Sequence, residues 1–341
     1  MKISNYYKKL GNEVVLETTY DNIESFDKVY ISKVFTDTPI PEDITSLSWV
    51  EYGGTGFFFD KSPDLRYEIE HVFPDYHLYD DFINDLIANG AKASEFKEYT
   101  DYSIGFLTRG CFRKCGFCVN QKYDRVFPHS PLKEFYDPTR KKICLLDDNF
   151  LGQPNWRNYL EELIATGKPF KFKQGLDERL LTSEKCKLLF NCRYDGAITF
   201  AFDDVEDISI IIRKLNLIRE YTSQEIKFYV LCGFDSENKY DLNFWRQDLI
   251  NIFIRLDVLG RYHALPYIMR FKNYEKSPYK GIYITIARWC NQPGFFRNLT
   301  LNEFIDLTIE KGEKATARYR DELFKDYPDI VSKCFNRKYW K

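Results

Sequence analysis

The sequence of 341 residues has no run of apolar residues that approaches the ~20 needed to cross a bilayer. Its first twenty residues also lack the apolar stretch that is typical of a secretory signal peptide. We therefore expect a cytoplasmic protein with no membrane partner. In a reducing compartment, nine cysteines favour metal or thiol chemistry over disulfide bonds, and their odd number disfavours complete pairing.

A large excess of charge of either sign is also missing, because the formal net charge is −2. The overall charge therefore gives no reason to expect nucleic acid as a partner. The distribution is less even: residues 1–100 carry 9 Lys and Arg against 19 Asp and Glu, whereas residues 261–341 carry 16 against 9. A solvated face with a basic tail explains this asymmetry, and a surface for an anionic substrate is the alternative.

The usual signature of a phosphate-binding loop is absent as well. Residues 53–57, "GGTGF", are rich in glycine, but they lack the GxGxxG pattern and no P-loop lysine follows them. This stretch predicts a plain turn. A composition of 44% hydrophobic and 17% aromatic residues is ample for a sizeable core.

After residue 103, apolar strand-like runs alternate with segments of helical spacing. This alternation predicts an α/β fold with parallel strands joined by crossovers. Pro154 near the start and Gly167 at the end of one such segment are typical of helix boundaries, and Ser183 is a plausible cap of the next. The predicted strands lie within 103–110, 141–150, 170–181, 196–204, 226–235 and 264–271; the predicted helices lie within 154–167, 183–192, 205–221 and 241–260.

Polar residues gather where these predicted strands end. In β/α barrels and in doubly wound sheets alike, ligands bind at the carboxyl ends of the strands. We therefore expect the following side chains to converge on one rim: Asp147, Asp148, Asn149, Gln174, Asp177, Asp203, Asp204, Asp235 and Arg270.

The two ends of the chain differ from this central region. Residues 1–100 predict a small α/β domain that starts as helix, strand, loop and strand within 7–19 and 26–37. Residues 299–324 have helical spacing and predict a cover over the edge of the central sheet. We expect three regions: a small α/β domain (1–100), a β/α domain (101–275) and a C-terminal helical extension (276–341).

Three cysteines lie close together in "FLTRGCFRKCGFCVNQ", residues 106–121. Cys111, Cys115 and Cys118 are an unusual set for structural zinc, which takes four ligands, although His129 leaves a Cys3His zinc site as an alternative. A [4Fe–4S] cluster normally takes four thiolates, so three leave one iron open for a substrate or cofactor. Nearby glycines (Gly110, Gly116) and basic residues (Arg109, Arg113, Lys114) suit a tight loop around an anionic cluster.

With Phe117 in its aromatic slot, this segment resembles the CxxxCxΦC signature of radical S-adenosylmethionine (SAM) enzymes. The resemblance covers roughly 103–271. "TRGCFRKCGFC", "LLDDNFL" and "QGLDERLL" look most like the subgroup in which a small cobalamin-binding-like domain precedes the barrel. The implied fold is a partial (β/α)6 TIM-like barrel.

The resemblance also implies a reaction. A [4Fe–4S] cluster on the three cysteines reductively cleaves SAM to methionine and a 5′-deoxyadenosyl radical, which abstracts hydrogen from a substrate. A reductant such as flavodoxin or ferredoxin is the implied partner. No catalytic residue is assigned. The resemblance assigns Phe117 to a place beside the SAM adenine, and it assigns Gly233 to a position that leaves room for the same ring. Asp148 and Asn149 stand where the family usually has a Gly-Gly-Glu-like stretch that contacts the SAM amino group. The residues assigned to the ribose or the carboxylate of SAM are Gln174, Asp177 and Arg179. The alternative for each is an ordinary strand-end cap or surface ion pair.

Other cofactors are less favoured. The remaining six cysteines contain no second CxxxCxxC or CxxC, so we expect no auxiliary cluster. The DxHxxG ligand signature is absent, so cobalamin is not favoured, although related barrels bind it without that signature.

The substrate class and two other functions stay open at this point. Residues 267–281 and 286–298 interleave Arg and Lys with aromatic residues, which suits a nucleotide, RNA or other anionic metabolite; a helical cover over the barrel is the alternative. The competing functions are a non-enzymatic Fe–S protein for electron transfer or redox sensing, and a zinc-bound structural module.

Overall fold

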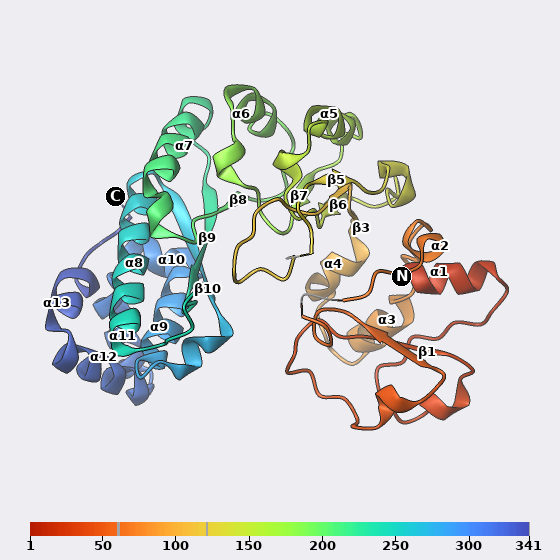
Figure 1. The fold of residues 1–341 in the computed structure, drawn as a ribbon, viewed down its shortest axis with the longest axis horizontal. Coiled ribbons are helices and arrows are strands. Elements are labelled where there is room, and N and C mark those ends of the chain that lie inside the picture. Colours follow the sequence, from red (N-terminus) through yellow and green to blue (C-terminus); the bar gives the residue numbers. More distant parts are fainter. Residues whose placement is uncertain (60–61, 121, 341) are drawn as a thin grey trace. The chain divides into compact units, whose positions relative to one another are not determined.

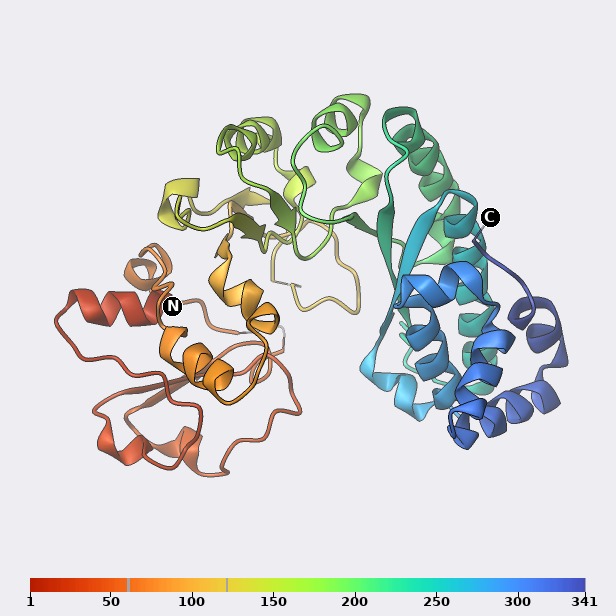
Figure 2. The ribbon, with the colours of Figure 1, turned by 180° about the vertical axis from the view of Figure 1, so that it is seen from behind.

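The computed structural model describes residues 1–59, 62–120 and 122–340 and is a mixed α/β protein (Figures 1 and 2). Backbone contacts divide the chain into two compact units. The first comprises residues 1–148 and 161–170, and the second comprises 149–160 and 171–341. The regions 1–100, 101–275 and 276–341 stay a prediction about domains. No helix in the described ranges is long and apolar enough to span a membrane.

The strands are short and most of them are parallel to their neighbours. In chain order they are β1 (Val29–Ser32), β2 (Val50–Gly53), β3 (Tyr102–Gly105), β4 (Thr108–Arg109), β5 (Phe127–Pro128), β6 (Lys142–Leu145), β7 (Phe170–Phe172), β8 (Ile198–Ala201), β9 (Ile226–Cys232) and β10 (Ala264–Arg270).

The α-helices lie between and after these strands. They are α1 (Lys2–Lys9), α2 (Tyr67–Glu70), α3 (Asp80–Ala88), α4 (Lys97–Thr100), α5 (Trp156–Ala165), α6 (Ser183–Leu189), α7 (Ile208–Tyr221), α8 (Leu242–Arg261), α9 (Lys280–Cys290), α10 (Pro293–Asn298), α11 (Leu301–Glu310), α12 (Lys314–Asp326) and α13 (Pro328–Ile330).

The first unit begins with the small α/β region that the sequence predicts. Helix α1 leads to β1, which pairs in parallel with β2, and Val29 lies opposite Val50. The first strand predicted within 7–19 is wrong, because residues 13–17 at the end of that segment form no regular structure. The turn predicted at 53–57 is present: Gly54 has φ +99°, and a Cβ there would collide with the carbonyl oxygen of Lys33.

Strands β3, β6 and β7 form one three-stranded sheet in that order. In β6, Ile143 and Leu145 are fully buried, which agrees with the uniformly apolar run expected of a buried parallel strand. The sheet begins the β/α series, and the last passage of the chain from the first unit to the second falls within β7.

Strands β8, β9 and β10 form a second parallel sheet, again in chain order. Leu176, which follows β7, makes an isolated parallel bridge to Phe200 of β8. All six predicted strand segments therefore contain strands. Among the described residues, no sheet closes into a barrel.

Local sequence explains where the helices begin. The side chain of Asp241 accepts a hydrogen bond from Phe244 N at 2.8 Å and starts α8. Thr300 and Glu303 form a capping box that starts α11. The cap predicted at Ser183 is wrong by one residue: Thr182 has the extended backbone of a cap, and its hydroxyl accepts from Lys185 N.

Candidate functional site

The three clustered cysteines lie in an irregular segment, residues 110–120 and 122–126, which we call the cysteine loop. Strands β4 and β5 flank it and pair antiparallel, with Thr108 opposite Pro128 and Arg109 opposite Phe127. Gly110 starts the loop with φ +86°, and a Cβ there would collide with Arg125 O. The close approach of the two ends of the cysteine loop therefore requires glycine at this position.

One carboxylate ties this loop to the end of β6. Asp148 Oδ2 accepts a hydrogen bond from Gly110 N at 2.7 Å, and its Oδ1 accepts one from Asn120 Nδ2 at 2.7 Å. These contacts hold residues on both sides of the cysteines. The contacts that Asp148 makes in the structure therefore support the loop, and its predicted place near the SAM amino group stays a prediction.

The neighbouring carboxylate, Asp147, is buried and serves the backbone before the loop. It accepts hydrogen bonds from Leu107 N at 3.2 Å, Thr108 N at 2.7 Å and Thr108 Oγ1 at 2.6 Å. Burial raises the pKa of Asp147 to about 6, although the hydrogen bonds from Thr108 oppose this shift. Asp147 therefore joins the segment after β6 to residues 107–108 by hydrogen bonds.

The cysteine sulfurs receive hydrogen bonds from the backbone. Arg113 N donates to Cys111 Sγ at 3.3 Å, and Asn120 N donates to Cys118 Sγ at 3.4 Å. Cys118 N also donates to Cys115 O at 2.9 Å, which turns the chain between these two cysteines. Backbone N–H donors of this kind stabilise negative charge on ligating sulfur.

The donor set of the cysteine loop fits an iron–sulfur cluster in its chemistry: three partly exposed thiols, N–H donors on two sulfurs and basic residues beside them. Within residues 1–59, 62–120 and 122–340, however, no three His, Cys, Asp or Glu side chains are grouped so that they could hold a metal ion.

His129, the alternative fourth ligand, follows β5. Its Nδ1 lies 3.0 Å from Ser130 Oγ, and its Nε2 lies 3.4 Å from Glu70 Oε1. Burial lowers the pKa of His129, although the charge of Glu70 opposes this effect. Both ring nitrogens thus face partners within the protein. Phe117 is half-buried in the cysteine loop.

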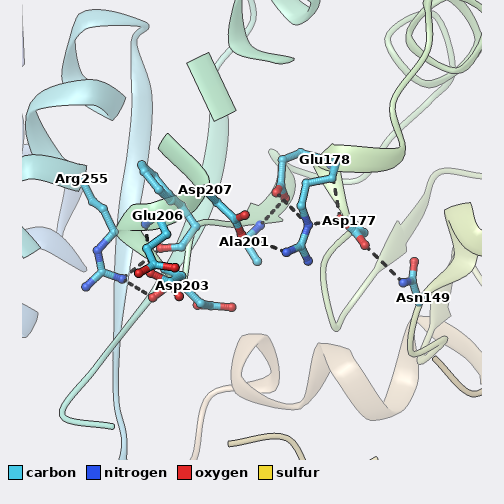
Figure 3. A network of polar contacts seen from close by, with 11 residues as sticks. Asn149, Asp177, Glu178, Ala201, Asp203, Glu206, Asp207 and Arg255 are labelled. Carbon is cyan, nitrogen blue, oxygen red and sulfur yellow. Dashed lines mark hydrogen bonds and ion pairs between the residues drawn. The ribbon is translucent and has the colours of Figure 1, made fainter. Parts of the chain in front are cut away.

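In the second unit, polar side chains meet at the carboxyl ends of β7 and β8 (Figure 3). Asn149 Nδ2 donates to Asp177 Oδ2 at 3.4 Å. Arg179 pairs with Asp177 through Nε at 2.8 Å and with Asp207 at 3.0 Å. Three predicted SAM residues, Asn149, Asp177 and Arg179, therefore lie in one network, whereas Gln174 is exposed in the turn after β7.

Sequence reasoning missed a central member of this network, Glu178. It is only 1% exposed, and its Oε2 accepts a hydrogen bond from Ala201 N at 3.2 Å. Its Oε1 is buried and has no hydrogen-bond partner among the described residues, although Arg179 Nε lies 3.7 Å from it. Burial and the charge of Asp177 raise the pKa of Glu178 to about 8, so this carboxyl is mostly protonated at pH 7.

The ends of β8 and β9 are fastened to α8 by a buried arginine. Arg255 donates hydrogen bonds to the carbonyl oxygens of Phe202, Asp203 and Leu231 at 3.1, 2.8 and 2.8 Å. Burial raises the pKa of Asp203 to about 6, while Arg255 opposes the shift. These contacts fix the backbone of the rim rather than offering groups to a ligand.

Gly233 follows β9 with φ +75°, and its N–H donates to Asp248 Oδ2 at 2.9 Å. A Cβ at Gly233 would lie 2.9 Å from Tyr274 Cβ. The packing of Tyr274 against Gly233 therefore explains the glycine without a ligand, and the predicted room for an adenine stays a prediction.

Burial raises the pKa of five thiols outside the cysteine loop, those of Cys186, Cys192, Cys232, Cys290 and Cys334.

The geometry therefore gives two groups of predicted residues, each within one unit: the cysteine loop with Asp148, and the rim network of Asn149, Asp177 and Arg179. Comparison of the chain with protein-family models and with curated proteins finds no match.

Proposed function

We propose that the chain is a radical SAM enzyme in which Cys111, Cys115 and Cys118 hold a [4Fe–4S] cluster. The observation that carries the proposal is the cysteine loop. Three thiols at this spacing lie in a loop that a β-ladder closes and that Asp148 ties to the end of β6. Three thiolates for four irons leave one iron open for SAM.

The order of the strands supports the partial (β/α)6 barrel that belongs to this proposal. Strands β3, β6 and β7, and then β8, β9 and β10, are neighbours in chain order. The bridge between Leu176 and Phe200 continues that order from β7 toward β8. A β/α barrel has sequential strand order, whereas a doubly wound sheet reverses its order at a switch point. The six strands therefore favour a barrel-like arrangement.

The chemistry that such a cluster supplies is one-electron reduction of SAM, giving methionine and a 5′-deoxyadenosyl radical that abstracts hydrogen from a substrate. The residues of this chain hold and orient the ligands. In the rim network, Arg179 lies between Asp177 and Asp207. We therefore assign ligand contact to Asp177, which Arg179 orients, rather than to Arg179 itself.

The test is anaerobic reconstitution of the full chain with iron and sulfide, followed by addition of dithionite and SAM. The wild type is expected to bind about four irons per chain and to release 5′-deoxyadenosine. Cys115→Ala is expected to lose both, whereas Cys192→Ala, which changes a thiol outside the cysteine loop, keeps both.

Each competing function predicts a different result. An intact cluster that yields no 5′-deoxyadenosine would overturn the proposal in favour of a non-enzymatic Fe–S protein. A colourless protein that retains zinc after purification would overturn it in favour of a structural zinc module. Retention of the cluster by Cys115→Ala would contradict the ligand assignment.

A further inference from the structure

The sheet β8–β9–β10 has one face on which several side chains are partly exposed. Side chains of β9 alternate between buried and partly exposed along the whole strand. The buried set includes Phe228 and Val230, and α8 packs against β9 and β10. The other set, which includes Lys227 and Tyr229, lies on the opposite face. We call this the open face.

Strand register shows which residues share the open face. Tyr229 lies opposite Ala201 of β8 and opposite Tyr267 of β10. Residues opposite each other in parallel strands point to the same side of the sheet. Parallel sheets are normally covered on both faces, so a partly exposed face that carries aromatic rings is a place for a ligand. Tyr267 is 39% exposed there.

The side chains of the open face contact one another. Lys227 Nζ lies 5.8 Å from the centre of the Tyr267 ring. The rings of Tyr229 and Tyr267 have centres 5.8 Å apart and meet edge to face. The hydroxyl of Tyr229 donates to Lys173 O at 3.1 Å, which joins this cluster to the residue after β7.

Lysine side chains lie beside the open face as well as on it. Lys171 and Lys173 are two residues apart, so they point to the same side of the extended segment that begins with β7. Burial raises the pKa of Tyr229, and the charges of Lys173 and Lys171 oppose that shift, as expected for ammonium groups near the phenol. The positions of β8, β9 and β10 on this side of the sheet carry no acidic residue; they are Thr199 and Leu265, which are buried, and Ala201, Lys227, Tyr229, Leu231, Tyr267 and Met269.

We propose that the open face binds a nucleotide through its phosphate and its planar base, and that this nucleotide is the substrate of the enzyme. Lysine ammonium groups attract phosphate as point charges, and an exposed tyrosine ring offers a surface on which a base stacks. The name "substrate" rests on the proposed function, whereas binding of a nucleotide by this face does not. The residues that would bind it are Lys171, Lys173, Lys227, Tyr229 and Tyr267.

The experiment titrates the reconstituted full chain, with saturating SAM present, with each ribonucleoside 5′-monophosphate by calorimetry. At least one is expected to bind, with a Kd that rises as salt is added. Lys227→Gln and Tyr267→Ala are each expected to raise that Kd at least tenfold. Lys187→Gln, which changes an exposed lysine of α6, is expected to leave it unchanged.

Binding of none of the four nucleotides would overturn the inference. Equal Kd values for Lys227→Gln and Lys187→Gln would overturn it too, as would equal binding of the parent nucleoside without phosphate. Formation of 5′-deoxyadenosine by the same preparation without nucleotide tests the proposed function separately. Nucleotide binding without SAM cleavage would support this inference and overturn the proposed function. SAM cleavage without nucleotide binding would overturn this inference and support the proposed function.

Discussion

Asp148 and Gly110 are joined by a hydrogen bond of 2.7 Å from the backbone nitrogen of Gly110 to Oδ2 of Asp148. The second carboxylate oxygen accepts from Asn120, so a single side chain holds the cysteine loop at its start and near its last cysteine. The support of the loop therefore depends on a residue that lies beyond it in the sequence, at the end of β6.

Replacement of this carboxylate tests that support. In Asp148→Ala, both hydrogen bonds are lost, so the loop should hold a cluster less firmly, with at least threefold less iron per chain after reconstitution. Iron and sulfide analysis measures the effect. Asp124→Ala removes an exposed carboxylate from the same loop and is the matched control. Equal iron content in the two variants would contradict the role of Asp148.

Gly110 and Gly90 provide a matched pair of substitutions. Both have positive φ, +86° and +100°, but only at Gly110 would a Cβ meet other atoms, the first being Arg125 O. Gly90→Ala is expected to cost about 1 kcal/mol for its backbone conformation alone. Gly110→Ala should cost about 2 kcal/mol or more, because the β4–β5 ladder must also shift. Urea unfolding measures both, and equal costs would show that the close approach is unimportant.

Glu178 makes stability depend on pH. Its pKa is about 8 in the folded protein and about 4.5 when unfolded, so its contribution to stability is present below pH 4.5 and is lost as pH rises through 8. Between pH 5 and pH 9, the wild type should lose roughly 3–5 kcal/mol relative to Glu178→Gln, since each pKa unit is worth about 1.4 kcal/mol.

Urea unfolding of both proteins at these two pH values measures this difference. Glu206→Gln, which changes an exposed acid beyond β8, should follow the wild type. If Glu178→Gln also followed the wild type, the carboxyl would not be the titrating group.

The two aspartates that pair with Arg179 should differ in their effect on SAM binding. Asp177→Asn is expected to weaken SAM at least tenfold, because Asp177 is assigned to ligand contact. Asp207→Asn removes only the second partner of Arg179 and should weaken it less than threefold. Calorimetry of SAM binding to the reconstituted protein measures both. Equal effects would mean that Asp177 acts only through Arg179.

Much of the strand layout follows from local sequence. The apolar runs 196–204 and 226–235 contain β8 and β9, because side chains such as Phe200 and Phe228 must be buried whatever the tertiary fold. Residues 13–17 show the limit of this reasoning. They have the apolar content of a strand but form none, because a strand also needs a partner and local pattern does not specify one.

The candidate site was predictable from the sequence only at the three cysteines, where metal-ligating side chains stand at a characteristic spacing. Glu178 has no local signal, since an acidic residue between Asp177 and Arg179 is typical of a solvated turn. In the folded chain, Glu178 accepts a hydrogen bond from Ala201 N of β8, and this partner is 23 residues away in the sequence. The close packing at Gly233 likewise depends on Tyr274, which approaches only in the folded chain.

The central claim is that three side chains of the cysteine loop hold four irons and leave one open for SAM. Mössbauer spectroscopy of the chain reconstituted with 57Fe, recorded before and after addition of SAM, tests it most directly. We predict a [4Fe–4S] spectrum in which SAM changes the parameters of one iron in four. A cluster whose four irons all ignore SAM, or a site with a single metal ion bound by four side chains, would contradict the account.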